Sequence, residues 1–250
     1  MSYRKASSLA ALILFIPFLA VAGPSKPVSD AQIRSSVQEK LNDLNLRSKD
    51  VDVHDGTVTL KGTVSSRWLK DEAADRVRKI DGVTQVVNDF TVMKAEKDDL
   101  IAEQVSDSLG RYVFFSIFDD VDGQVHDGVV TLTGKVTMPY KAKEMADLAA
   151  RVRGVQAVEN KIETLPVSTF DDELRVAIAD RIYRDPMFWN YGLPVNPPIH
   201  VIVEHGHVTL TGVVNNQMER TVAGTIARGV FGSFSVENRL RLDEEARSSN

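Results

Sequence analysis

A nine-residue pattern that occurs three times constrains the fold of this chain more than any other feature. Its copies, at residues 56–64, 128–136 and 206–214, share the form Gly-x-Val-Thr-Leu-x-Gly-x-Val and begin 72 and then 78 residues apart. Such self-similarity is typical of a repeated supersecondary unit. The 250-residue chain is therefore expected to hold three small modules that pack on each other, since a unit of this size is marginally stable alone.

Apolar residues at helical spacing precede each copy of the pattern. They recur at i, i+4 and i+8 on one helix face, and they are Ile33, Val37 and Leu41, then Ile101, Val105 and Leu109, then Leu174, Ile178 and Ile182. Acidic residues stand before each set, namely Asp30, Asp98 or Asp99, and Asp171 or Asp172. Carboxylates at a helix start are favoured by unpaired amides and the positive end of the helix dipole. We interpret these residues as N-caps rather than as catalytic acids.

Two strands around a tight turn, a second helix and a last strand complete the unit. Each turn places a glycine where a hairpin needs positive φ, and the alternating apolar residues of the pattern predict one buried face. The second helices are expected near residues 68–80, 140–152 and 218–230. The predicted fold class is α+β, with three tandem αββαβ modules, each a small three-stranded mixed sheet with two helices on one face.

Nine residues of the repeated half are interpreted as structural. The first motif glycines supply the turn, the second ones allow a helix to approach or mark a bulge, and the amides need a fixed hydrogen-bond partner. They are Gly56, Gly62 and Asn88, then Gly128, Gly134 and Asn160, then Gly206, Gly212 and Asn238. A small residue of the second helix, Ala74, Ala146 or Gly224, is expected to cross the second glycine.

The hairpin pattern, followed by a helix and Gly-Val-x-x-Val-x-Asn, resembles the BON domain, the family named for bacterial osmotically induced and nodulation proteins. The resemblance covers nearly the whole chain after residue 22. It implies a non-enzymatic role at the bacterial envelope, with phospholipid as the ligand proposed for the family, and it brings no catalytic motif or cofactor. The chain lacks the lipidated cysteine of the lipid-anchored exported members, so the folded modules or partners must supply any membrane association.

The first 22 residues have the features of a cleaved signal peptide, with an uncleaved membrane anchor as the alternative. Arg4 and Lys5 precede an apolar run that is too short for a comfortable membrane span, and Ala20-Val21-Ala22 is a small-x-small cleavage site. We divide the chain into a signal peptide (1–22) and three BON-like domains (23–97, 98–168 and 169–250), and expect a periplasmic protein.

Composition excludes several function classes. The chain has no cysteine, which excludes disulfides, thiolate metal sites and thiol nucleophiles. Removal of the signal peptide changes the formal net charge from −5 to −7, which argues against nucleic acid as a partner.

The segment between the first helix and the turn glycine lengthens from copy to copy. It spans 15, 19 and 24 residues, counted from Leu41, Leu109 and Ile182. The added residues are aromatic or apolar, and eight of them are candidates for contact with lipid or a partner: Tyr112, Phe114, Phe115, Phe118, Phe188, Trp189, Tyr191 and Leu193. Alternatively, the second insertion extends a helix into the core or covers a neighbouring repeat. The prolines of the third insertion favour a stiff surface excursion.

No metal, cofactor or catalytic site is predicted. His200, His205 and His207 lie near Glu204, but the other copies have no equivalent cluster, and Phe118 stands where a calcium loop beginning there would need an acidic ligand. The sequence therefore favours a non-enzymatic envelope protein that binds membrane phospholipid or envelope proteins. The alternative is a periplasmic chaperone-like or adaptor protein. The sequence predicts no oligomeric state for the chain.

Overall fold

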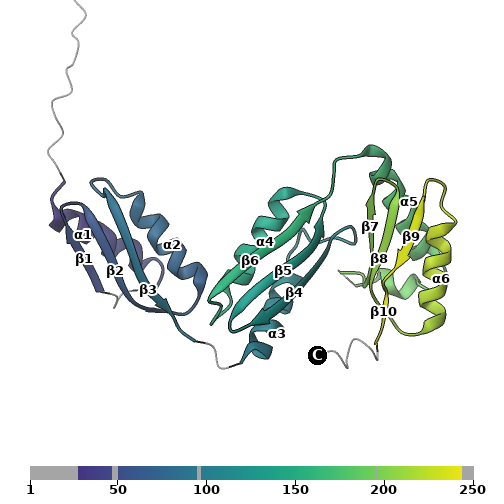
Figure 1. Cartoon of the computed structure of the whole chain (residues 1–250), viewed down its shortest axis with the longest axis horizontal. Helices are drawn as coiled ribbons and strands as arrows, with labels where there is room; N and C mark the ends of the chain where they lie inside the picture. Colours follow the sequence, from purple (N-terminus) through teal and green to yellow (C-terminus); the bar gives the residue numbers. More distant parts are fainter. Residues whose placement is uncertain (1–27, 47–49, 95–96, 195, 244–250) are drawn as a thin grey trace, which may run out of the picture.

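The computed structural model describes residues 28–46, 50–94, 97–194 and 196–243, so the predicted signal peptide lies outside the described residues. Three α+β modules follow one another in a bent row (Figure 1). The first module contains α1 (Asp30–Asn42), β1 (Asp50–His54), β2 (Thr57–Val64), α2 (Arg67–Arg78) and β3 (Gln85–Val92). The second contains α3 (Asp98–Gly110), β4 (Asp120–His126), β5 (Val129–Val136), α4 (Pro139–Arg151) and β6 (Ala157–Thr164). The third contains α5 (Thr169–Arg184), η1 (Trp189–Gly192), β7 (Ile199–Glu204), β8 (His207–Val214), α6 (Gln217–Arg228), β9 (Ser235–Asn238) and β10 (Arg241–Leu242).

The repeated pattern forms the central strand of each sheet. β2 pairs antiparallel with β1 and parallel with β3, and β5 pairs in the same way with β4 and β6. β8 pairs antiparallel with β7. On its other side it pairs parallel with β9 and, further along the strand, with β10. The alternating residues of the pattern, such as Val58 and Leu60, are buried against the helices. The three mixed sheets with their helices confirm the predicted fold class.

The N-cap interpretation of the acidic residues is wrong. Ser29 caps α1 in a capping box with Gln32, and Asp30 is the first helical residue. Ser168 caps α5, and α3 begins after Lys97 without a side-chain cap. The sequence analysis predicted correctly that these aspartates lie at helix starts. It was wrong that their carboxylates accept hydrogen bonds from the amides of the helix.

One aspartate at the first helix start of each module instead binds the hairpin turn of that module. The Asp30 carboxylate accepts hydrogen bonds from the amides of Asp55 and Gly56 at 3.0 and 3.1 Å. Asp98 and Asp171 do the same for their turns, at residues 127–128 and 205–206. Both central turn residues have positive φ, as the hairpin prediction requires. Burial works to raise the pKa of Asp171, but the bonds from Gly206, His205 and Ser168 outweigh it, and the pKa lies below its ordinary value.

Two of the second motif glycines, Gly134 and Gly212, face the backbone of the neighbouring strand segment rather than a helix. A Cβ at Gly134 would overlap the carbonyl oxygen of Asp120 on β4, and one at Gly212 would overlap that of Pro198. The expected crossing with the small helix residue is therefore wrong, because Gly224 lies against the amide of Asn238 instead. These glycines let the first strand of the module pass close to the second.

The repeated asparagines join the last strand to the second helix. Asn88 Nδ2 donates to the carbonyl of Lys70 on α2 at 2.7 Å, and Asn88 Oδ1 accepts from the amide of Phe90 at 3.4 Å. Asn160 and Asn238 make the same two bonds in their modules. The partner is the backbone, as the sequence interpretation expected.

Candidate functional site

Buried side chains hold the third insertion against the core of its module. Phe188 is fully buried in the core of the third module and packs beside Tyr191. The Tyr191 hydroxyl donates to Glu219 Oε2 at 2.5 Å and accepts from the amide of Asn215 at 3.0 Å. Burial, and then the bond to the Glu219 carboxylate, raise the pKa of Tyr191 to about 12. The insertion is therefore a packed turn with fixed side-chain directions.

Two apolar side chains of this turn point outward. Trp189 is 61% exposed and Leu193 is 70% exposed, at the start and just after the end of η1. Of the four candidates predicted in this insertion, these two are open to contact. The prediction that Phe188 contacts lipid or a partner is wrong. Phe188 is a core residue and cannot reach a surface while the third module is folded.

Most aromatic side chains of the second insertion pack against the cores of the second and third modules. Tyr112 is buried in the core of the second module, where burial and its hydrogen bond to Glu144 raise the pKa of its hydroxyl. Phe115 packs on the same core and its ring lies 5.3 Å from that of His200, while Phe118 packs against the core of the third module. Covering a neighbouring repeat, one of the two open interpretations, is what the structure shows for Phe118. Phe114 is about half exposed.

Residues 116–119 form the surface on which the third module is docked. The amide of Val201 donates to the carbonyl of Ile117 at 2.7 Å, and His200 Nδ1 lies 2.5 Å from the carbonyl oxygen of Asp119. Lys135 pairs with Glu204 across the same junction. Here the edge of β7 meets the segment that leads into β4.

A buried ion pair holds this segment in place. Asp119 is fully buried, and its carboxylate accepts from Lys141 Nζ at 2.6 Å and from the amides of Ser116 and Thr137 at 2.9 and 2.8 Å. Burial works to raise the pKa of Asp119, but the bonds from Lys141, Thr137 and Ser116 outweigh it, and the pKa lies below its ordinary value. The sequence analysis did not identify this pair.

The first and second modules meet through backbone groups. The amide of Arg67 donates to the carbonyl of Val155 at 3.1 Å, and the amide of Gly154 donates to the carbonyl of Ser65 at 2.8 Å. Helices α2 and α4 contact each other, and the Arg151 guanidinium lies 4.1 Å from the centre of the Trp68 ring.

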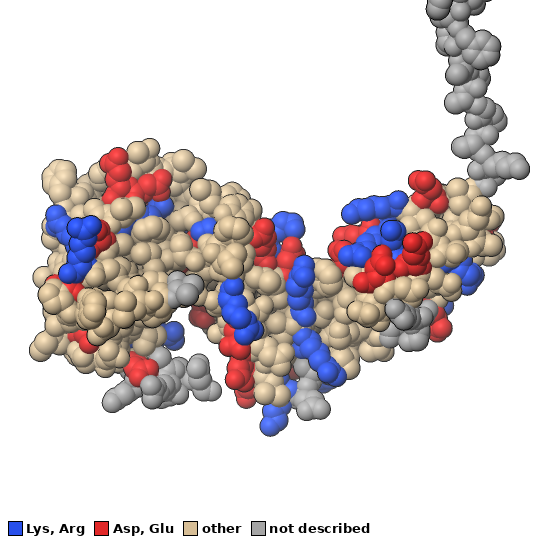
Figure 2. Space-filling view, turned by 180° about the vertical axis from the view of Figure 1, so that it is seen from behind, with Lys and Arg blue, Asp and Glu red and all other residues tan. Residues whose placement is uncertain are grey.

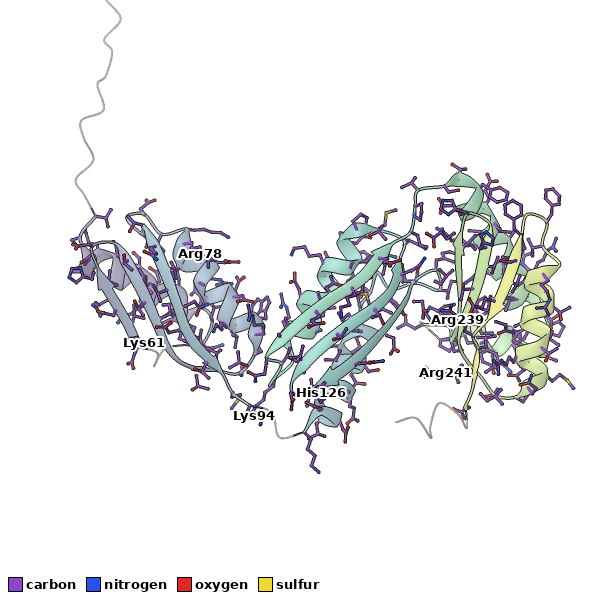
Figure 3. The ribbon with its side chains drawn as sticks, viewed as in Figure 1. Lys61, Arg78, Lys94, His126, Arg239 and Arg241 are labelled. Atoms are coloured by element: carbon purple, nitrogen blue, oxygen red, sulfur yellow. The ribbon has the colours of Figure 1, made fainter. Side chains whose placement is uncertain are left out.

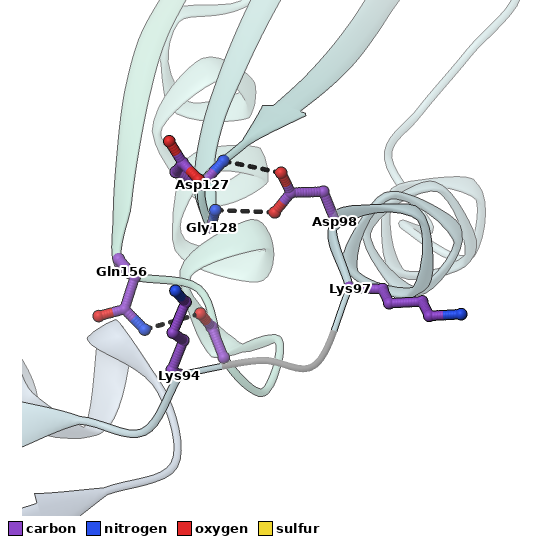
Figure 4. Close-up of a pocket in the computed structure, with 7 residues that line it drawn as sticks. Lys94, Lys97, Asp98, Asp127, Gly128 and Gln156 are labelled. Atoms are coloured by element: carbon purple, nitrogen blue, oxygen red, sulfur yellow. Dashed lines mark hydrogen bonds between the residues drawn. The ribbon is translucent and has the colours of Figure 1, made fainter.

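A hollow of about 210 Å³ lies beside this junction. Figure 4 shows the Asp98 carboxylate bound to its hairpin turn there, with Lys94 beside Gln156 and Lys97 directed away. Gln156 Nε2 donates to the carbonyls of Met93 and Gly154, so it links the two modules.

An exposed aromatic group at one end of the third module was not found from the sequence. Phe231 is 97% exposed and Phe234 is 71% exposed, in the turn between α6 and β9. Phe170, about half exposed, stacks on Phe234 with ring centres 6.1 Å apart. We call Phe170, Phe231 and Phe234 the aromatic tip. A signal was present, because Phe231 and Phe234 stand where the other copies have Asp81 and Thr84, or Arg153 and Gln156.

A cleft of about 570 Å³ lies between the second and third modules. Arg239 extends toward it from the third module (Figure 3), and Lys135, Lys161, Glu163 and Glu204 also line it. Lys135, Lys161 and Arg239 each pair with a glutamate. Blue and red side chains accordingly alternate over the middle of the molecule in Figure 2. This cleft is polar and charge-balanced, without the unpaired cations that would attract an anion.

Two of the three histidines of the third module have hydrogen-bonding partners for a ring nitrogen. His200 is bound at the junction, and His207 Nδ1 lies 2.7 Å from Ser235 Oγ. Across residues 28–46, 50–94, 97–194 and 196–243, no group of three or more His, Cys, Asp or Glu side chains is arranged to hold a metal ion. Within those same ranges, none of the helices has the length and apolar character needed to span a bilayer.

The repeated geometry agrees with comparisons to known proteins. The family model for the BON domain matches residues 29–94, 97–166 and 171–244. The chain therefore belongs to the BON domain family.

Individual relatives are distant. Osmotically-inducible protein Y of Escherichia coli (strain K12) is 27% identical over 147 residues, a match that covers 55% of this chain and 73% of that protein. Two structures of CdsD, a structural protein of the type III secretion system of Chlamydia trachomatis, are 16% and 17% identical. They cover 86% and 87% of this chain and 99% and 96% of their own, each with a TM-score of 0.24. At that TM-score the likeness carries no argument about this chain.

Proposed function

We propose that this chain is a non-enzymatic protein of the bacterial envelope that binds phospholipid surfaces through the exposed turn of its third module and supports tolerance of osmotic or envelope stress. Export by the predicted signal peptide would place it in the periplasm. The name of the distant Escherichia coli relative, an osmotically inducible protein, supports the stress role.

The observation that carries the lipid proposal is the division of one short turn into buried and exposed side chains. Phe188 and Tyr191 hold the turn against the module, while Trp189 and Leu193 stand outside it. Trp favours the headgroup level of a bilayer and Leu the acyl region. Because the turn is already ordered, little conformational entropy is lost when it inserts.

The negative net charge of the protein opposes binding to anionic lipid and determines how binding should depend on salt. A net charge of −7 after removal of the signal peptide repels anionic lipid at long range. Apolar insertion must therefore dominate, so binding should become stronger, not weaker, as salt is raised. This salt dependence distinguishes insertion from attraction to a basic patch.

Cosedimentation with liposomes of phosphatidylethanolamine and phosphatidylglycerol tests the proposal. The chain from residue 23 should sediment with them, and Trp189→Ala with Leu193→Ala should lower the partition constant at least about fivefold, since two apolar contacts of more than about 1 kcal/mol in total are lost. The matched control is Phe231→Ser with Phe234→Ser, which removes two exposed aromatics at the other site and should leave sedimentation unchanged. Absence of sedimentation at every lipid composition and salt concentration would reject the lipid role.

The adaptor alternative has a separate readout. A protein that contacts unfolded clients through exposed apolar residues should slow the aggregation of a denatured test protein. Suppression of aggregation without liposome binding would favour the adaptor over the lipid-binding protein.

A further inference from the structure

The junction between the first two modules shows which two surfaces of this fold fit together. One surface is the loop after β2 with the start of α2, residues 65–68, and the other is the glycine turn after α4, residues 153–156. We call them the loop surface and the turn surface. Ser66, in the docked loop surface, is only 2% exposed, and Val155, in the docked turn surface, is fully buried.

The same two surfaces recur, undocked, in the later modules. The loop surface of the second module is residues 137–140, where Met138 stands at the position of Ser66 and is 50% exposed. The turn surface of the third module is residues 231–234 and carries Phe231 and Phe234 of the aromatic tip. Within the chain these two surfaces stay apart, because the third module is held on the second through β7 and residues 116–119.

These two undocked surfaces have exposed apolar side chains at three positions where the docked pair has polar ones: Met138 for Ser66, Phe231 for Arg153 and Phe234 for Gln156. The loop surface of the second module has Met138, Pro139 and Tyr140 in place of Ser66, Arg67 and Trp68, and the Phe114 ring lies 6.2 Å from that of Tyr140, edge to face. On the turn surface, Phe234 replaces Gln156, the residue that links the first two modules. Contiguous exposed apolar side chains on a soluble module mark interaction sites.

Pro139 explains why the second junction does not copy the first. Arg67 donates its amide to Val155, and proline at the equivalent position has no amide to donate. A contact at the second loop surface therefore lacks one of the two backbone hydrogen bonds of the first junction and must depend more on side-chain packing. The aromatic tip supplies such side chains.

We propose that the aromatic tip of one copy docks on the loop surface of the second module of another copy, so that the chain self-associates. The contact repeats the geometry of the first junction between two molecules, with aromatic and methionine packing in place of the hydrogen bond that Pro139 cannot donate. It joins two different surfaces, so it either closes into a two-fold dimer with two equal contacts or continues as a chain of molecules. The proposal does not rest on lipid binding.

Sedimentation velocity without lipid provides the main test. The chain from residue 23 should associate reversibly as its concentration rises. Phe231→Ser with Phe234→Ser, and separately Met138→Ser with Tyr140→Ser, should each weaken association at least about thirtyfold, because buried aromatic contacts dominate interface energies. Trp189→Ala with Leu193→Ala removes equally exposed residues outside both surfaces and should leave association unchanged.

Mixing the two defective variants makes the test specific. Each variant keeps the surface that the other has lost, so the equimolar mixture should form a one-contact dimer although neither variant associates alone. Because the natural chain has no cysteine, a second assay is available in the wild-type background. Copies with Pro139→Cys should form disulfides with copies carrying Ser233→Cys, since these positions correspond to Arg67 and Val155, and far less with copies of their own kind.

Two results would overturn the proposal. One is a monomeric wild-type protein at all accessible concentrations, and the other is a mixture of the two variants that stays monomeric. If the wild-type protein is monomeric and its liposome binding is lost in Phe231→Ser with Phe234→Ser, the aromatic tip is assigned to lipid instead. Circular dichroism of each variant verifies that the modules remain folded.

Discussion

The two junctions of this chain join similar modules by different chemistry. The first uses backbone amides and carbonyls of the loop surface and the turn surface, at Ser65, Arg67, Gly154 and Val155. The second uses residues of the lengthened segment before β4, including Phe118, around the buried pair of Asp119 and Lys141. The insertions therefore serve first to position the third module. Side chains not used in that packing, such as Trp189 and Leu193, remain exposed.

The largest expected effect comes from breaking the buried ion pair of the second junction. Asp119→Ala leaves the ammonium of Lys141 buried without its partner and removes the acceptor for the amides of Ser116 and Thr137. Loss of one partner of a buried pair costs about 3–5 kcal/mol. Urea unfolding should show this loss, and the third module should detach from the second before it unfolds.

The double change Asp119→Leu with Lys141→Met tests whether the unpaired charge is responsible. Replacing both charges with apolar side chains should recover much of the lost free energy of unfolding, because no buried charge remains. No recovery would show that the hydrogen bonds to the 116–119 segment matter more than the charge.

The next largest effect is expected from acid, because lowering the pH should weaken the second junction and leave the first unchanged. The pKa of Asp119 is lower in the folded protein than its ordinary value of about 3.9, so the carboxylate stabilises the fold above about pH 4. This stability is lost as pH falls through the lowered pKa. The first junction uses backbone groups and a neutral amide, which do not titrate there.

Hydrogen exchange can follow both junctions in one sample. Between pH 6 and pH 3, the protection factor of the Val201 amide, which donates across the second junction, should fall more than that of the Gly154 amide, which donates across the first. Equal losses at both amides would mean that Asp119 does not control the second junction.

The module itself could be predicted from sequence because its signals are local. Turn glycines, alternating apolar residues and helical spacing each act within a few residues, and three copies agree on them. The role of Asp30 could not be predicted in this way. A carboxylate at a helix start satisfies either helix or turn amides, and the choice depends on where a turn 25 residues later is placed.

The exposed surfaces were harder to predict for the same reason. Phe188 and Trp189 are adjacent aromatics in a segment without periodicity, and only the shape of the third core decides that the first is buried and the second exposed. Phe231 lies in the repeated half of the module, where the pattern predicts structural residues and not contact residues. Comparing the copies position by position, and noting apolar residues where the others are polar, would have found it.

The first junction should respond to loss of a single amide. Arg67→Pro removes the donor to Val155 at a position, the first residue of α2, where proline is well tolerated. Arg67→Ala is the matched control, because it also removes the ion pair with Asp71 but keeps the amide. Protection of the Gly154 amide should fall about tenfold in the proline variant, for a bond worth about 0.5–1.5 kcal/mol, and should be unchanged in the alanine variant. Equal effects would assign the junction to the Arg67 side chain.

The smallest expected effect concerns the cation over the Trp68 ring. Arg151→Ala should lower the free energy of unfolding by about 0.5–1 kcal/mol, the usual range for an exposed cation–π contact. Trp68 also packs on the first core, so its own replacement costs more for an unrelated reason. A double-mutant cycle of Arg151→Ala with Trp68→Leu separates the two contributions. A coupling energy near zero would leave the first junction dependent on its backbone pair and Gln156 alone, and would make its contrast with the side-chain-dependent second junction sharper still.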